Sequence, residues 1–265
     1  PQEHKSLNIN LGTILPTNLS GYNATSELKM FLPEMRFATN NISYYFFKDC
    51  YDVKKQKVLD AFNILKEQTG NLNFYEVTNY GVEVPPQISI YCSELQKPTK
   101  NNSFVAGEGG PDRLLNSSLY PLIISGEIYL YGSAYKKDCD YPVLELHELL
   151  HVFGFDHLND TESVLYPFLS CDQRINELIT SKIAKLYSIE PKADIFIESL
   201  TATKGGIYLD FEMKASNRGL IDSKDIFLDI YNADKNQKIG NLSLSTISPG
   251  ESTTLKIKNF ALPSS

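Results

Sequence analysis

Three of the four histidines in this chain of 265 residues fall within eleven positions, in the string H-E-L-L-H-V-F-G-F-D-H from His147 to His157. If residues 147–153 are helical, His147 and His151 lie four positions apart on one face, where both rings can bind one metal ion. Gly154 can adopt a positive φ, which allows the helix to end and the chain to return His157 as a third ligand. We therefore predict a zinc site with His147, His151 and His157 as its ligands.

The chemistry of such a site depends on the fourth coordination position. Three neutral imidazoles leave one position of a tetrahedral zinc ion open, which is typical of a catalytic rather than a structural site. Glu148 follows the first ligand directly and lies within reach of a water molecule in that position, so it is the candidate general base. A structural site gains nothing from a buried carboxylate at this place, and burying one is costly. Glu148 therefore favours hydrolytic chemistry.

The residues around this string predict a buried helix, because they are apolar on nearly every side. They are Val143, Leu144, Leu146, Leu149, Leu150, Val152 and Phe153. Polar side chains on a buried helix need partners, and a bound metal ion supplies the partner here.

The string H-E-x-x-H-x-x-G-x-x-H resembles the signature of the metzincin zinc endopeptidases. After it, Ser163–Pro167 (S-V-L-Y-P) resembles the Met-turn of the matrixin branch, with Leu165 in place of the methionine. The resemblance implies that Leu165 forms an apolar floor under the zinc ligands, for which leucine has a similar volume. Pro167 stands at the position of the tyrosine that can ligate zinc in astacin-like enzymes. We therefore expect Tyr166 to be structural or pocket-lining, and not a ligand.

The resemblance implies a zinc-dependent endopeptidase that hydrolyses peptide bonds by zinc-activated water, with Glu148 as general base and then general acid. The pattern from residue 42 onwards agrees with it, since strand, helix, strand and strand resemble the upper subdomain of metzincins. These elements are expected at Ile42–Phe47, Asp52–Gly70, Asn73–Val77 and Gln87–Cys92. The implied fold is a twisted mixed sheet with helices above a zinc cleft.

A further strand is predicted before the zinc helix, at the place of the cleft-edge strand of the family. Such an edge binds an extended peptide through main-chain hydrogen bonds. The residues expected to do so are Gly126, Glu127, Ile128, Tyr129 and Leu130. The alternative is an ordinary strand paired on both sides. The preceding stretch, from Ala106 to Leu122, is expected to be a loop, and it lacks the Asp-rich calcium loop of matrixins. Structural calcium or a second zinc ion is therefore left open.

The chain is long enough for two domains, and its texture changes near Glu190-Pro191. A helix is expected before this point, at Asp172–Leu186. Short alternating strands separated by turn signals follow it and predict a β-sandwich. This part resembles the CARDB or immunoglobulin-like domains of prokaryotic surface proteins. The fold class is therefore α+β, with an irregular N-terminal arm (1–40), a metzincin-like peptidase domain (41–190) and an all-β sandwich (191–265).

Four cysteines are compatible with two disulfides, and sequence alone allows three connectivities. Cys50 and Cys92 each close a predicted strand, whereas Cys139 precedes the zinc helix and Cys171 follows the Leu165 turn. These positions favour Cys50–Cys92 and Cys139–Cys171. The alternative of a free cysteine that caps the zinc, as in matrixin pro-segments, is disfavoured because the first forty residues contain no cysteine.

Composition indicates an extracytoplasmic protein, secreted or on the cell surface. A net charge of -7 argues against a nucleic-acid partner. No apolar run approaches the ~20 residues that cross a bilayer, and the chain begins at Pro1 without a signal peptide, so we expect a processed or engineered fragment. N-x-[ST] sequons are more frequent than the roughly three expected by chance. They begin at Asn18, Asn23, Asn41, Asn101, Asn116, Asn159 and Asn241. The alternative is an Asn- and Ser-rich surface without glycans.

Two other functions are compatible with the sequence. One is a non-catalytic adhesion or recognition module that retains zinc for stability. The other is a latent protease whose cleft is blocked by residues 1–40. For the enzyme, the expected partners are a peptide or protein substrate and, through the sandwich, a cell-surface or protein partner.

Overall fold

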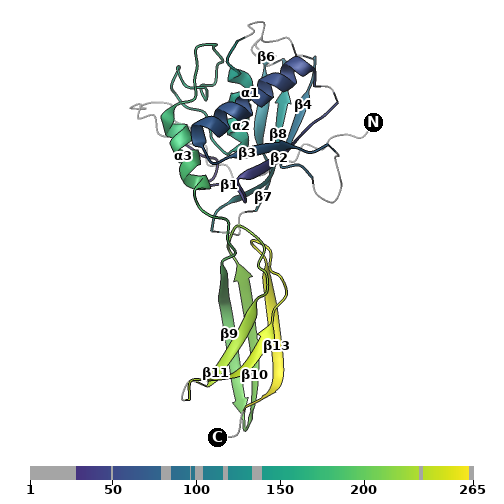
Figure 1. Ribbon diagram of the computed structural model, residues 1–265, viewed down its shortest axis with the longest axis vertical. Coiled ribbons are helices and arrows are strands. Elements are labelled where there is room, and N and C mark those ends of the chain that lie inside the picture. Colours follow the sequence, from purple (N-terminus) through teal and green to yellow (C-terminus); the bar gives the residue numbers. More distant parts are fainter. Residues whose placement is uncertain are drawn as a thin grey trace.

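The computed structural model of this chain describes residues 28–48, 50–78, 85–95, 97–98, 104–115, 119–132, 139–232 and 235–262. One body contains a mixed sheet and helices, and the described residues of a second, elongated body form strands and no helix (Figure 1). The chain passes from the first to the second after α3. No helix among the described residues is both long enough and apolar enough to cross a membrane.

The first body is built on one six-stranded sheet, in which β7 is antiparallel to its neighbour and the other pairs are parallel. Its strands are β1 (Arg36–Phe37), β2 (Asn41–Phe46), β3 (Asn73–Glu76), β4 (Ile88–Cys92), β7 (Gly107–Leu115) and β8 (Leu122–Leu130). Their order is β1–β8–β4–β2–β3, and β7 pairs along the whole length of β8. β1 and β4 therefore share the other side of β8. A short hairpin, β5 (Lys97–Pro98) and β6 (Phe104–Val105), precedes β7.

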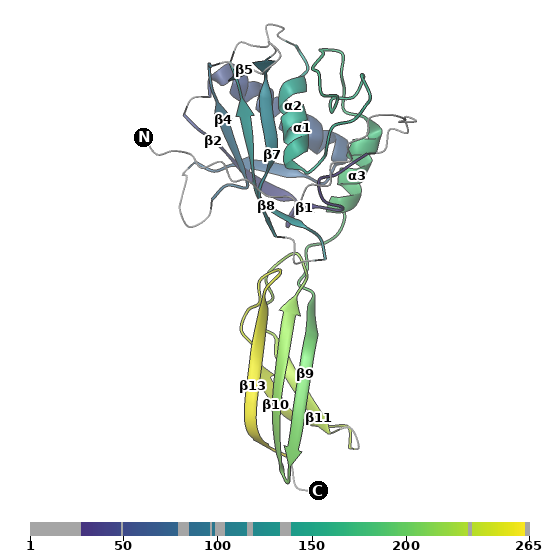
Figure 2. The same ribbon diagram turned by 180° about the vertical axis from the view of Figure 1, so that it is seen from behind.

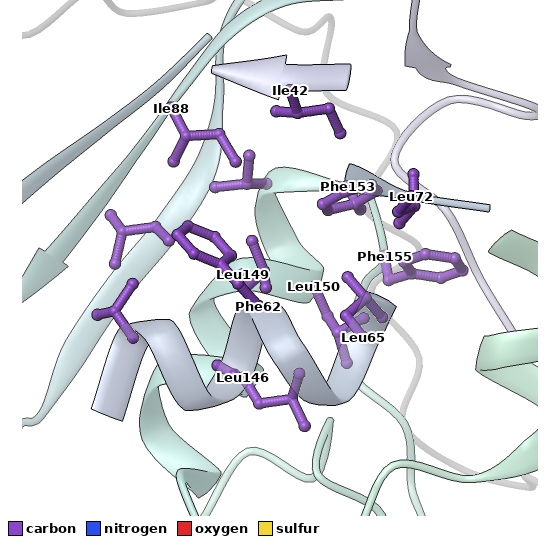
Figure 3. Packing of buried hydrophobic residues seen from close by; sticks show 14 of the residues in the cluster. Ile42, Phe62, Leu65, Leu72, Ile88, Leu146, Leu149, Leu150, Phe153 and Phe155 are labelled. Atoms are coloured by element: carbon purple, nitrogen blue, oxygen red, sulfur yellow. The ribbon is translucent and has the colours of Figure 1, made fainter. Parts of the chain in front are cut away.

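The helices of this body are α1 (Asp52–Thr69), α2 (Val143–Val152) and α3 (Glu177–Tyr187). α1 and α2 cross on one face of the sheet, as Figure 2 shows from behind. Figure 3 shows the core between them, to which sheet and helices contribute Ile42, Phe62, Leu65, Ile88, Leu146, Leu149 and Leu150. Gly70 ends α1 with φ 72°, a conformation that favours glycine. The predicted helix and the neighbouring predicted strands are therefore confirmed to within a residue at each end.

The N-terminal arm predicted at 1–40 contributes more to this core than its irregular sequence indicates. Arg36 and Phe37 form β1 and are fully buried. The Arg36 guanidinium donates hydrogen bonds to the carbonyl oxygens of Leu186 and Ile189, which ties β1 to the end of α3. Two residues are too few to show a strand period, and the partners of β1 are distant in sequence. Residues 1–27 of the predicted arm lie outside the described residues.

α3 begins five residues later than the predicted helix at Asp172–Leu186. The Asn176 side chain accepts a hydrogen bond from the backbone N–H of Ile179, a helix N-cap that fixes the start at Glu177. Before it, Arg174 pairs with Ser163 as an isolated β-bridge. The chain at 172–176 is thus used to brace the segment after the zinc helix, which the apolar spacing of the helix does not reveal.

The second body contains five antiparallel strands in two sheets. They are β9 (Ile195–Gly205), β10 (Tyr208–Asn217), β11 (Phe227–Asn232), β12 (Gln237–Ser243) and β13 (Ser252–Ala261). One sheet has the order β13–β10–β9, and β11 pairs with β12 in the other. Met213, Ala215 and Ile247 form its buried centre. The short strands predicted for this part of the chain are therefore present.

Two disulfides bridge the first body, Cys50–Cys92 and Cys139–Cys171. They are the two pairs that the positions in the sequence favour. The first joins the segment before α1 to the end of β4. The second joins the segment before α2 to the segment between the Leu165 turn and α3, so it braces both sides of the histidine cluster.

Candidate zinc-binding active site

The histidines come together because α2 ends where the sequence predicts. His147 and His151 are buried on α2, one turn apart. The chain then turns at Gly154, which has φ 89°. A Cβ at Gly154 would also overlap the Met35 side chain, so both backbone conformation and space require glycine. This turn returns His157 to the other two rings.

The three imidazoles are arranged as metal ligands. Their Nε2 atoms lie 2.9, 3.3 and 3.3 Å from one another. A tetrahedral zinc ion with Zn–N bonds of about 2.0–2.1 Å holds nitrogens about 3.3 Å apart, so the spacing suits it. The Nδ1 atoms of His147 and His151 lie 2.6 and 2.7 Å from the carbonyl oxygens of Val164 and Phe155. Nδ1 must therefore carry the proton, and Nε2 presents its lone pair towards the other two rings, as a metal ligand does.

The protonation of these rings agrees with ligation. Burial, and after it the neighbouring His151, lower the pKa of His147 to about 3. Burial also lowers the pKa of His151. Both rings are therefore neutral at physiological pH, which is the form that binds a metal ion.

Glu148 lies beside the histidines in the same pocket, with only 4% of its surface exposed. The backbone N–H of Gly109 donates a hydrogen bond to its carboxylate. Burial, followed by the nearby carboxylates of Glu108 and Glu145, raises the pKa of Glu148 to about 8. A cation bound by the histidines would favour the ionised form of this group. The site thus places a carboxylate of high basicity next to a metal position.

The pocket around these groups has a volume of about 740 Å³ and is open to solvent. β7 and the segment before it form one part of its lining, and the chain after the Leu165 turn forms another. The remaining lining comes from the histidine segment and from Phe31. This volume is that of a site that holds a ligand rather than a closed structural metal centre.

A family comparison decides the relationship. The matrixin family model matches residues 36–188, more than half of the 265 residues. The chain belongs to the matrixin family. Over this region it has a mixed α/β, metzincin-like fold, with His147, His151 and His157 gathered as a group that could hold a metal ion.

The other comparisons are weaker. None of the curated proteins matches the chain. Among solved structures, this matrixin matches high choriolytic enzyme 1, a hatching-enzyme zinc protease from medaka (Oryzias latipes), with 17% sequence identity and a TM-score of 0.24. That match covers 52% of this chain and 54% of the other, so the chain spans about half the length of that enzyme.

The prediction that the substrate-binding edge strand lies at residues 126–130 is wrong. Gly126, Glu127, Ile128, Tyr129 and Leu130 belong to β8, which pairs with β4 on one side and β7 on the other. The Tyr129 hydroxyl donates a hydrogen bond to the Glu127 carboxylate, and the Tyr129 ring stacks on Tyr91. β8 is therefore an internal strand, which was the alternative. The edge strand of this matrixin is β7, which pairs on one side only among the described strands.

β7 lies where the sequence predicts a loop, because its glycines look like loop residues. Their positions are required by packing. A Cβ at Gly109 would lie 2.7 Å from the backbone carbonyl carbon of Glu148, and a Cβ at Gly107 would lie 2.7 Å from the Glu148 carboxylate. Glycine allows the edge strand to approach α2 closely. A glycine-rich stretch before the zinc helix was the available signal for these functional residues.

The turn predicted around Leu165 contacts the first histidine of the cluster. The carbonyl oxygen of Val164 binds His147, and the N–H of Tyr166 donates to Ser163 to close the turn. Leu165 is fully buried in the main core cluster. Pro167 is exposed and lines the pocket, whereas the Tyr166 ring lies against Phe168. Leu165 is thus fully packed, and its equivalence to the family methionine stays a prediction.

We expect Leu165→Met to change the free energy of unfolding by less than about 1.5 kcal/mol, because the two side chains match in volume and both are apolar. Thermal melts of the zinc-loaded proteins measure this. Leu165→Ala is the control, with an expected loss of about 2–5 kcal/mol from the cavity. A loss for the methionine variant as large as for the alanine variant would show that this position does not accept the family residue.

Proposed function

We propose that this matrixin is an endopeptidase that binds catalytic zinc through His147, His151 and His157 and uses Glu148 as its general base and acid. The observation that carries the proposal is the arrangement of Nε2 lone pairs 2.9–3.3 Å apart, with a buried carboxylate in the same open pocket. Zinc, when bound, supplies Lewis-acid polarisation of the scissile carbonyl and of water.

In the proposed reaction, Glu148 takes a proton from the attacking water and later donates it to the leaving amine. Its placement supports this role, since the Gly109 N–H holds one end of the carboxylate and burial excludes bulk solvent. His147 and His151 donate hydrogen bonds from Nδ1 to the carbonyl oxygens of Val164 and Phe155, and these bonds fix the orientation of both rings. Water is the nucleophile, so the chain forms no covalent intermediate with the substrate.

The substrate is proposed to bind along β7 rather than β8. An extended peptide can add to the free edge of β7 through main-chain hydrogen bonds, which places its carbonyl groups along the pocket. Gly107 and Gly109 support this because they line the pocket within contact distance of Glu148. The glycines have no side chains to obstruct the approach of a peptide backbone.

The non-catalytic alternative is disfavoured by the same residues. A zinc site kept for stability does not need a buried glutamate or an open pocket of about 740 Å³ beside it. The latent-protease alternative concerns residues 1–40, of which 1–27 lie outside the described residues. In the described part, Phe31 lines the pocket and leaves it open to solvent.

The chain is proposed to act outside the cytoplasm. Two disulfides support this, because they persist in oxidising compartments. Asn41, Asn159 and Asn241 are exposed, as N-glycosylation requires, and the other four sequons lie outside the described residues.

Residues 191–265 are proposed to form a separate CARDB- or immunoglobulin-like domain that binds a protein or surface partner. The two small sheets with a shared apolar centre support that fold.

Incubation of the zinc-loaded chain with a peptide library tests the proposed function. We expect internal cleavage of peptides, detected by mass spectrometry, which stops when a chelator removes the metal and returns when zinc is added. Cleavage that persists after complete removal of zinc would contradict the proposal. Release of terminal residues alone would contradict the assignment as an endopeptidase.

A further inference from the structure

We propose that Phe31 is a specificity-determining residue, whose ring receives a bulky apolar side chain of the peptide substrate. This inference rests on the proposed function, since it assigns one subsite of the same pocket. Phe31 comes from the N-terminal segment, far in sequence from the zinc ligands, yet it lines the pocket beside them. No sequence motif marks it.

The backbone around Phe31 is fixed to the segment between the second and third histidines. The N–H of Phe31 donates to the carbonyl oxygen of Gly154 at 2.8 Å. The N–H of Asp156 donates to the carbonyl oxygen of Lys29 at 3.0 Å, and Met30 and Phe155 form an antiparallel bridge between them. These two hydrogen bonds flank the Met30–Phe155 pair, so the segment around Phe31 runs antiparallel to the segment at 154–156.

This pairing decides which way the side chains point. Directly opposite residues in an antiparallel pair share a face, and successive residues along a strand take opposite faces. Phe155 is fully buried, and the partly buried Met30 packs against the same core. Phe31 is therefore on the other face, towards the pocket. Its ring lies over the imidazole of His151, with centroids 6.0 Å apart and an interplanar angle of 26°.

The surface of Phe31 is available to a ligand, since 44% of the residue is exposed. The first body exposes two other phenylalanines among its described residues, Phe104 and Phe168, and both line the same pocket. They come from separate segments, before β7 and after the Leu165 turn. Exposed aromatic rings that gather at one concave site mark an apolar recognition surface. Phe31 differs from the other two because its ring stacks on a histidine of the cluster, His151.

The apolar rings that line this pocket determine which kind of substrate side chain binds there. Phenylalanine rings have no hydrogen-bonding group, so they gain free energy from an aromatic or large aliphatic side chain and little from alanine. The position of Phe31 over His151 places this subsite next to the metal ligands. Phe31 therefore contacts the side chain of a substrate residue close to the scissile bond.

The test compares peptides that differ only by phenylalanine, alanine or arginine at each position near the scissile bond. The zinc-loaded full chain is used for kcat/KM, and the Glu148→Gln chain, which does not require turnover, is used for Kd. We expect Phe31→Ala to lower the preference for phenylalanine over alanine at one position about tenfold in both measurements. Phe31→Val should give a smaller loss in the same direction. Phe227→Ala removes an exposed phenylalanine of the second body, and we expect it to change neither ratio.

The proposal would be overturned if Phe31→Ala changed kcat/KM and Kd equally for the phenylalanine and alanine peptides. A loss of kcat/KM or affinity for the arginine peptides alone would also overturn it. Zinc content and thermal melts identify a variant that has lost the fold, in which case Phe31→Val decides by the same criteria. The Kd ratio separates this inference from the proposed function. A Phe31-dependent ratio without cleavage by the parent chain would retain the subsite and reject the peptidase.

Discussion

Replacement of Glu148 by glutamine is expected to leave the fold and the zinc content unchanged and to lower kcat by about 10²- to 10⁴-fold. The two side chains have nearly the same size, so the buried position stays filled. The amide oxygen of glutamine can still accept the hydrogen bond from the Gly109 N–H. What the amide cannot do is take a proton from water. The effect should therefore fall on kcat, with zinc binding and the melting temperature close to those of the parent.

Glu145→Gln is the matched control for this prediction, since it makes the same chemical change one turn earlier on α2. Glu145 does not line the pocket, so we expect its variant to retain activity within a few-fold. Metal analysis, thermal melts and single-turnover hydrolysis of a short peptide give the comparison. Turnover of the Glu148 variant at the rate of the Glu145 variant would reject Glu148 as the general base.

A methyl group at Gly109 is expected to have the second large effect. In Gly109→Ala, the Cβ would lie 2.7 Å from the carbonyl carbon and 2.8 Å from the Cα of Glu148, and both are backbone atoms that cannot rotate away. β7 and α2 must then separate. We expect a loss of about 3 kcal/mol in the free energy of unfolding. Because the Gly109 N–H also orients the Glu148 carboxylate, we expect activity to fall about 100-fold.

Gly110→Ala is a close control, because it adds the same methyl group one residue later on the same strand. A Cβ at Gly110 meets no atom within 4 Å, so its variant should melt and cleave like the parent. Urea unfolding and kcat/KM on one peptide are sufficient. If Gly109→Ala behaves like Gly110→Ala, β7 does not pack on the general-base residue, and the proposed substrate edge must be placed elsewhere.

The sequence alone predicts the parts of this protein that depend on local spacing. His147 and His151 are four positions apart, which one turn of helix converts into a shared face. Gly154 is required by its own φ, a backbone property that a residue type reveals directly. The apolar face of α1 and the alternating strands of the second body follow from the same periodicities.

Other features depend on residues that meet only in the tertiary structure. The edge strand β7 has glycine at Gly107 and Gly109 because α2 lies against it, and its strand pairing, rather than the propensity of its residues, determines its conformation. The family resemblance implied that β8 is the edge, and the sequence could not correct this, because alternation shows that a segment is a strand but not how many neighbours it has.

Phe31 and Arg36 illustrate the same limit from the N-terminal side. Their positions depend on partners more than 100 residues away, the segment at Gly154 for Phe31 and the end of α3 for Arg36. Neither segment has a periodicity or motif that names its partner. The sequence thus determined the metal-binding chemistry of this matrixin, because ligand type and spacing are local. Only the tertiary structure decided which strand and which phenylalanine form the cleft around it, because those choices are made by long-range packing.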